Sequence, residues 1–167
     1  DIDGTNYPFV TINANTAHKS GDSYYFPNVW IQQGEVITQQ FAMTANNTAA
    51  RFEIPSANVD STTLTVTVQE SSTNSYTEEY VLSQDITETT ANSRIYYLEE
   101  NENLNYTIQF GDGVIGYRPK VGNIVIVTYL DTDGVNANDI SKFNFIDPVS
   151  QTLDRKSTRL NSSHIPL

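Results

Sequence analysis

Apolar and polar residues alternate along much of this chain with a period of two. In the stretch TLTVTVQ, residues 63–69, the apolar residues Leu64, Val66 and Val68 fall on one side and threonines on the other. This pattern is typical of a half-buried β-strand. The stretch NIVIVTYL, residues 123–130, is almost entirely β-branched or aromatic and predicts a central strand. No long window repeats apolar positions at helical spacing, so the pattern predicts an all-β fold.

Several other segments show the strand pattern between turn-forming residues. Residues 24–43 break at Gly34, which predicts two strands and a turn, and residues 76–82 form a weaker partner for the threonine-rich strand. Residues 93–100 and 104–110 flank the polar sequence ENEN in the manner of a hairpin. Together these segments predict antiparallel, sandwich-like sheets of about eight to ten short strands. The strands would be divided between two small β units.

The polar stretch ANNTAA, residues 45–50, is the weakest join between the predicted strands. We therefore expect an N-terminal β unit over residues 1–48 and a β domain over residues 49–153. The chain begins at Asp1 without a methionine, so we expect it to be a piece of a longer protein and the first unit to be partial.

Residues 154–167 differ in composition from the rest of the chain. The stretch DRKSTRLNSSH, residues 154–164, can be back-translated in frame as a widely used sequencing-library adapter, so we interpret this tail as not native. The stretch holds three bases and one acid, a net of +2, so the formal charge of −11 becomes −13 without it.

Composition excludes several kinds of site. The 167 residues include no cysteine, which excludes disulfides, cysteine zinc sites and cysteine nucleophiles, and the two histidines are too few for a convincing histidine metal site. No apolar run approaches the roughly 20 residues of a membrane-spanning helix. The acidic charge disfavours nucleic acids and anionic membranes. We therefore expect no nucleic-acid or membrane partner and no cysteine- or histidine-based metal site. We also expect no small-molecule substrate and no cofactor, and we assign no residue as a metal ligand.

The sequence FGDGVIG carries Gly111, Gly113 and Gly116, and four interpretations compete for it. A phosphate-binding loop would need a helix after the glycines, but Pro119 and a β-branched run follow. Neither Asp112 nor the sequence DTDG at residues 131–134 fits an EF-hand, although an irregular calcium site stays an alternative. The third interpretation pairs Asp112 with a nearby glutamate, Glu99 or Glu100, for acid–base chemistry, but such pairs are common by chance in a chain with 20 acids.

The fourth interpretation is mechanical, and we favour it. Asp112 and Gly113 form a dipeptide preferred in hairpin turns, because glycine accepts a positive φ without steric cost. Gly111 and Gly116 would complete a hairpin between two strands, with Gly116 at a bulge or close contact, and Gly122 would form the next turn. The glycines would therefore serve as structural turn residues.

Three aromatic residues are candidates for an interface or for the core. Trp30 would stack a sugar in a carbohydrate-binding module, but we favour a core or subunit-interface position. Tyr97 and Tyr117 alternate with apolar positions and are expected in the core or at an interface, where tyrosine is enriched.

The stretch from Tyr96 to Asn138 resembles the baseplate wedge subunit of contractile-tailed, myovirus-type bacteriophages, which is related to the baseplate J-like family. The shared pattern is an aromatic strand into F-G-D-G-x-x-G, then G-N-x-V-x-V-x-Y, then T-x-G-x-x-A-N. Upstream segments such as NVWIQQGEVITQQF look similar in the same order, so the resemblance covers about residues 20–147.

The resemblance implies a structural function. Such subunits hold the tail baseplate together by protein–protein contacts and relay the trigger for sheath contraction. The implied partners are other wedge subunits and copies of the full-length protein, and the implied location is the virion tail baseplate, assembled in the bacterial host cytoplasm. The family implies no catalytic residue and no cofactor, so we expect no enzyme.

Two other classes of protein stay open. A carbohydrate-binding β-sandwich of a tail fibre or adhesin would use Trp30 as its aromatic platform. A β-fold glycosidase would need two carboxylates at a fixed separation in a cleft, and the sequence favours no particular pair.

Overall fold

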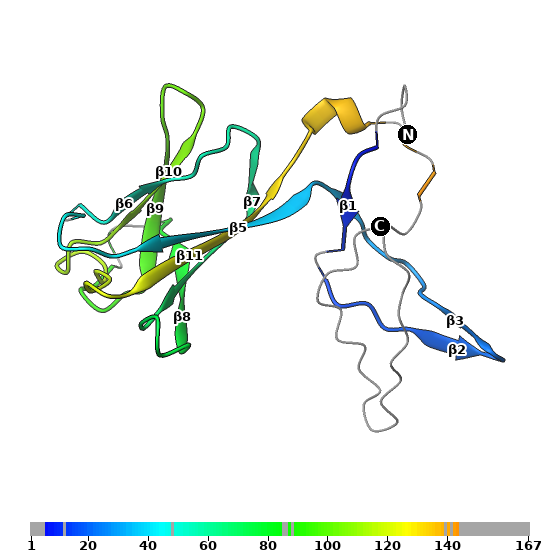
Figure 1. Cartoon of the computed structure of the whole chain (residues 1–167), viewed down its shortest axis with the longest axis horizontal. Helices are drawn as coiled ribbons and strands as arrows, with labels where there is room; N and C mark the ends of the chain where they lie inside the picture. The colour runs from blue at the N-terminus through cyan, green and yellow to red at the C-terminus, as the bar shows by residue number, and fades with distance from the viewer. Residues whose placement is uncertain are drawn as a thin grey trace. The chain divides into compact units, whose positions relative to one another are not determined.

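The computed structural model describes residues 6–11, 13–47, 49–84, 87, 89–138, 140 and 142–143. Within these ranges the regular structure consists of β-strands and one 3₁₀ turn, so the predicted all-β fold is confirmed (Figure 1). The tail interpreted as adapter-derived, residues 154–167, lies outside the described residues.

The chain divides into two compact units, one formed by residues 1–35 with 132–167 and the other by residues 36–131. This boundary differs from the one expected at residues 48 and 49. The stretch around ANNTAA belongs to the second unit because its flanks are buried: Met43 and Ala50 are 3% and 1% exposed. The backbone N–H of Phe110 also donates to the Ala50 carbonyl at 3.1 Å, which ties this stretch to the sheet.

The second unit is built on one seven-stranded sheet with the order β5-β11-β7-β8-β9-β10-β6 (Figure 1). Its strands are β5 (Glu35–Ala42), β6 (Arg51–Glu53), β7 (Val59–Gln69), β8 (Thr77–Leu82), β9 (Ile95–Glu100), β10 (Tyr106–Phe110) and β11 (Ile124–Asp131). The pairs β7–β8, β7–β11, β9–β10 and β6–β10 are antiparallel, whereas β8 and β9 pair in parallel. The sheet is therefore mixed.

The threonine-rich strand and the β-branched strand predicted from sequence are β7 and β11, which pair directly within this sheet. Val66 of β7 is opposite Val127 of β11, and both side chains are fully buried. The register shifts between Thr128 and Leu130, and the hydroxyl of Thr63 accepts the Leu130 N–H at 3.0 Å there. A threonine hydroxyl thus satisfies a backbone donor at the irregularity.

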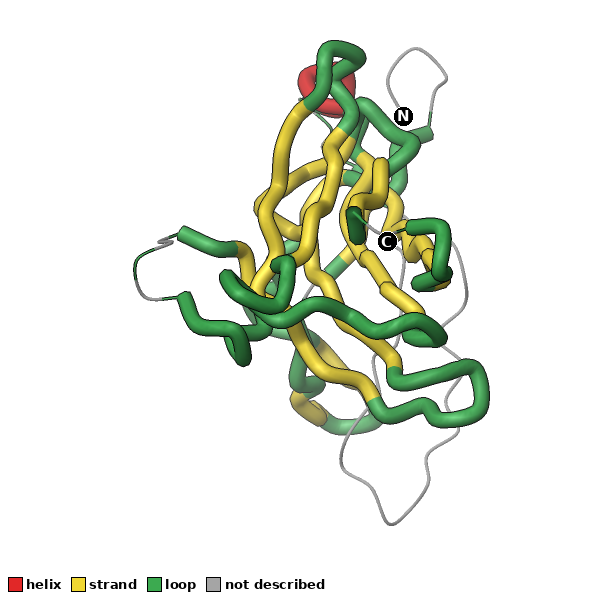
Figure 2. Tube along the Cα trace, turned by 90° about the vertical axis from the view of Figure 1, so that its left-hand side faces the viewer, coloured by secondary structure: helices red, strands yellow, loops and turns green. Residues whose placement is uncertain are grey.

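The two edge strands of the sheet approach each other across the core. β5 and β6 are the outermost strands, yet the rings of Phe41 and Phe52 lie 5.2 Å apart between centroids. Phe52 and Tyr80 each make an edge contact with Phe110, at 6.1 and 5.2 Å. The sheet must therefore curl around its apolar side chains, which produces the sandwich-like core (Figure 2).

The first unit contains short strands. β1 (Phe9–Val10) pairs with β4 (Gln32–Gln33), and β2 (His18–Ser20) pairs with β3 (Ser23–Tyr25). A 3₁₀ turn, η1 (Gly134–Ala137), follows Asp133. Gln33 holds the start of this turn, because its amide donates to the Asp133 carboxylate at 2.7 Å and accepts the Asp133 N–H at 2.8 Å.

Candidate functional site

The glycine-rich segment forms a loop between β10 and β11, from Gly111 to Asn123. β10 pairs with β9 and β6, whereas β11 lies between β7 and β5, so the loop joins strands that are not neighbours. The predicted FGDGVIG hairpin is therefore wrong, and no strand follows it until Ile124. The reason is a competing set of partners. Gly116 N–H donates to Thr90 O at 3.0 Å and Tyr117 N–H to Ser93 O at 2.8 Å, so the loop bonds to the turn before β9.

Three glycines of the loop have backbone conformations that favour glycine. Gly113 has φ +92°, in the region that glycine tolerates, and its N–H donates to Gly116 O at 3.0 Å. Gly116 and Gly122 also have positive φ values, +82° and +96°. Gly111 is required for a different reason, because a Cβ there would clash with the carbonyl carbon and oxygen of Gly116. Two backbone segments of the loop therefore pass within contact distance of each other.

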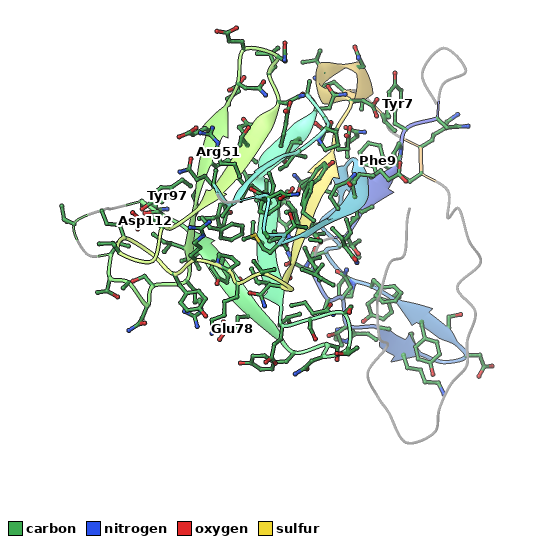
Figure 3. The ribbon with its side chains drawn as sticks, turned by 60° about the vertical axis from the view of Figure 1, so that its left-hand side comes forward. Tyr7, Phe9, Arg51, Glu78, Tyr97 and Asp112 are labelled. Atoms are coloured by element: carbon green, nitrogen blue, oxygen red, sulfur yellow. The ribbon has the colours of Figure 1, made fainter. Side chains whose placement is uncertain are left out.

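The Asp112 carboxylate holds the same turn together. Its Oδ1 accepts the N–H groups of Val114 and Ile115, both at 2.8 Å. These bonds, that of Ile115 first, lower the pKa of Asp112 below its usual value, because they stabilise the charged form. The side chain thus has a local structural role (Figure 3). Within the described ranges, no group of three or more acidic or histidine side chains is placed to hold a metal ion.

Arg94 links the loop to a neighbouring strand. Its guanidinium lies over the Tyr117 ring, 3.5 Å from the ring centroid, and its Nε donates to Glu78 Oε2 at 2.7 Å. Tyr117 itself is partly buried against the core. Arg94 thereby connects the loop to β8. Sequence reasoning missed this residue, because its two partners are 16 and 23 positions away in the chain.

The clamped loop presents apolar side chains to solvent. Val114 is 74% exposed, Ile115 is 43% exposed and Val121 is 68% exposed. A backbone held by hydrogen bonds on both sides keeps these side chains in place. Exposed apolar side chains on a well-ordered loop are a feature of protein contact surfaces.

Tyr97 lies on β9 (Figure 3) and lines an open pocket. The pocket has a volume of about 430 Å³, and its lining residues are Leu82, Ser83, Tyr97, Leu98, Glu99 and Gln109. Glu99 is ion-paired with Arg51 at 2.8 Å. Two of the three carboxylates considered for acid–base chemistry are therefore engaged in separate interactions, Glu99 with a guanidinium and Asp112 with backbone N–H groups.

Trp30 lies in the first unit and is 80% exposed. This exposure is inconsistent with a core position and leaves an interface or a ligand platform as its possible roles. Its apolar surface makes either role energetically reasonable.

Comparison with models of protein families gives no match, and comparison with curated proteins gives none either. In the described residues, no helix is long and apolar enough to cross a membrane.

Proposed function

We propose that this chain is part of a structural subunit of a phage tail baseplate wedge. It would hold the baseplate together through protein–protein contacts and relay the trigger for sheath contraction, without catalysing a reaction. Its partners would be other wedge subunits and copies of the full-length protein, in the tail baseplate of the virion. The proposal starts from the sequence pattern F-G-D-G-x-x-G followed by G-N-x-V-x-V-x-Y.

One structural observation carries the proposal. The F-G-D-G-x-x-G part of the stretch that carries the resemblance lies in a hydrogen-bonded loop with exposed apolar side chains, those of Val114, Ile115 and Val121. The loop's polar groups are occupied internally, as the Asp112 carboxylate and the Gly113 N–H illustrate. An arrangement of this kind supports contact with another protein better than it supports chemistry on a small molecule.

Relaying a mechanical trigger requires elements that move as a unit. The loop is joined to the turn at residues 90–93 by two backbone hydrogen bonds and to β8 through Arg94. Gly122 N–H also donates to Met43 O at 2.9 Å, next to β5. A displacement at the loop would therefore act on the turn before β9, on β8 and on the residue that follows β5.

Co-purification tests this proposal. The full-length subunit, produced with the products of neighbouring genes, should purify with baseplate proteins. Val114→Asp together with Val121→Asp should abolish co-purification without lowering thermal stability, because both side chains are exposed. Val135→Asp, at a position 81% exposed in the first unit, is the matched control. A subunit that purifies alone and hydrolyses a glycan would contradict the proposal.

The second candidate is a carbohydrate-binding β-sandwich of a tail fibre or adhesin. The observation that favours it is the 80% exposure of Trp30, the one tryptophan in the sequence. Titration with glycans while tryptophan fluorescence is followed distinguishes the two. A saturable change that Trp30→Ala abolishes would support sugar binding.

A further inference from the structure

In the part of the sheet that the structure describes, β9 extends past the end of β8, so its last residues have no strand beside them on that side. β8 pairs with β7 through Thr77 to Tyr80 and then with β9 at two positions, Val81 opposite Ile95 and Leu82 opposite Tyr96. β9 continues to Glu100, paired with β10 on its other side throughout. Among the described residues, no strand pairs with β9 beyond Tyr96 on the β8 side.

The orientation of the backbone groups along this edge follows from the observed bonds. Ser83 N–H donates to Tyr96 O at 2.8 Å, so the polar groups of Tyr96 point toward β8. Orientation alternates along a strand, so the N–H and C=O of Leu98 and Glu100 point to the same side, past the end of β8. Those of Tyr97 and Glu99 point toward β10. The edge therefore offers donors and acceptors at strand spacing.

We propose that this edge of β9 binds an extended segment of a partner protein as an added strand. The added strand would continue the line of β8 and bond to the backbone of Leu98 and Glu100. The chemistry of the edge calls for this occupant, because alternating N–H and C=O groups are matched by another extended backbone. The inference rests on the proposed function and deepens it by naming a contact surface and the type of partner.

The side chains around the opening define the partner further. Leu82 lies on the same face of β8 as the buried Tyr80, yet it is 41% exposed. It lines the pocket together with Leu98. An apolar side chain of the added strand would fill this space. Glu99, which lines the pocket, is already paired with Arg51, whereas Glu100 lies exposed at the strand end. With a chain charge of −11, the Glu100 carboxylate favours a partner strand that alternates apolar and basic residues.

Hydrogen exchange of the full chain tests whether the edge is open. In the free protein the amides of Leu98 and Glu100 should exchange fast, whereas those of Tyr97 and Glu99, which face β10, should be protected. Protection of Leu98 and Glu100 in the free protein would overturn the proposal, because the edge would already be covered.

A peptide probe then tests strand addition. The peptide KVKVKVK should protect the Leu98 and Glu100 amides, and the same peptide N-methylated at alternate residues should not, although its charge is equal. Glu100→Pro removes one edge N–H and should weaken binding about fivefold, as expected for one hydrogen bond. Glu100→Ala keeps the N–H and is the control for charge. Leu82→Asn is a second variant, which should weaken binding because it places a polar amide in the apolar space without changing the charge.

The outcomes separate this inference from the proposed function. Equal binding of both peptides would show attraction by charge alone and would overturn strand addition. If co-purification with baseplate proteins succeeds while the peptide leaves Leu98 and Glu100 unprotected, the proposed function stands and the β9 inference fails. If the peptide binds as expected and co-purification fails, the proposed function is the part that is wrong.

Discussion

Replacing Gly111 by alanine should destabilise the second unit more than the same change at Gly113, although Gly113 is the one with a positive φ. A Cβ on Gly111 would clash with backbone atoms of Ile115 and Gly116, and backbone cannot rotate away as a side chain can. A Cβ on Gly113, at φ +92°, meets nothing within 4 Å. The two variants therefore separate a backbone clash from conformational strain.

The magnitudes follow from what each change disrupts. Alanine in the left-handed region costs about 1–2 kcal/mol, partly offset by about 0.4–1 kcal/mol from the less flexible unfolded chain, so Gly113→Ala should cost roughly 1 kcal/mol. Relief of the Gly111 clash requires residues 115–117 to move, which breaks the bonds of Gly113 to Gly116, Gly116 to Thr90 and Tyr117 to Ser93. At about 0.5–1.5 kcal/mol each, the loss is roughly 2–4 kcal/mol.

Thermal unfolding followed by near-ultraviolet circular dichroism measures this difference. For a unit of about 100 residues, each kcal/mol lowers Tm by about 4–8 °C, so Gly111→Ala should lower it by roughly 10 °C or more. Gly21→Ala, at φ +60° with nothing within 4 Å, is the control in the first unit. Equal shifts for Gly111→Ala and Gly113→Ala would refute the close backbone approach.

Three further predictions concern acid stability, the arginine clamp and the tail. Because the pKa of Asp112 is lowered, the charged carboxylate stabilises the fold at pH values above the usual pKa of 3.8, and this stabilisation is lost as pH falls through the lowered pKa. Asp112→Asn should therefore make stability less dependent on pH in the acid range. An unchanged pH dependence would argue against the bonds to Val114 and Ile115. Arg94→Gln should cost about 1–2 kcal/mol in urea unfolding, because the ring contact and ion pair are both lost, and a neutral result would contradict the clamp. Deleting residues 154–167, the tail interpreted as adapter-derived, should leave Tm unchanged, and a drop of several degrees would contradict that interpretation.

Local pattern was sufficient to locate most strands of the second unit. The alternation in residues 63–69 lies within β7, and the segments 93–100 and 104–110 contain β9 and β10, which pair as the predicted hairpin. The positive φ at Gly113 was also predictable, since an Asp-Gly dipeptide favours such a turn. These features depend on neighbours in the chain, so a short window of sequence carries the information.

The choice of distant partners was decided by the tertiary structure. Nothing in the sequence around Gly116 shows that its N–H donates to the Thr90 carbonyl, or that β10 and β11 pair with different strands of the sheet. Nor does the sequence show that β8 pairs in parallel with β9, or that Phe41 and Phe52, from the two ends of the strand order, come into contact. Alternation determines which face of a strand is buried, whereas the packing of the whole core determines which strands lie side by side.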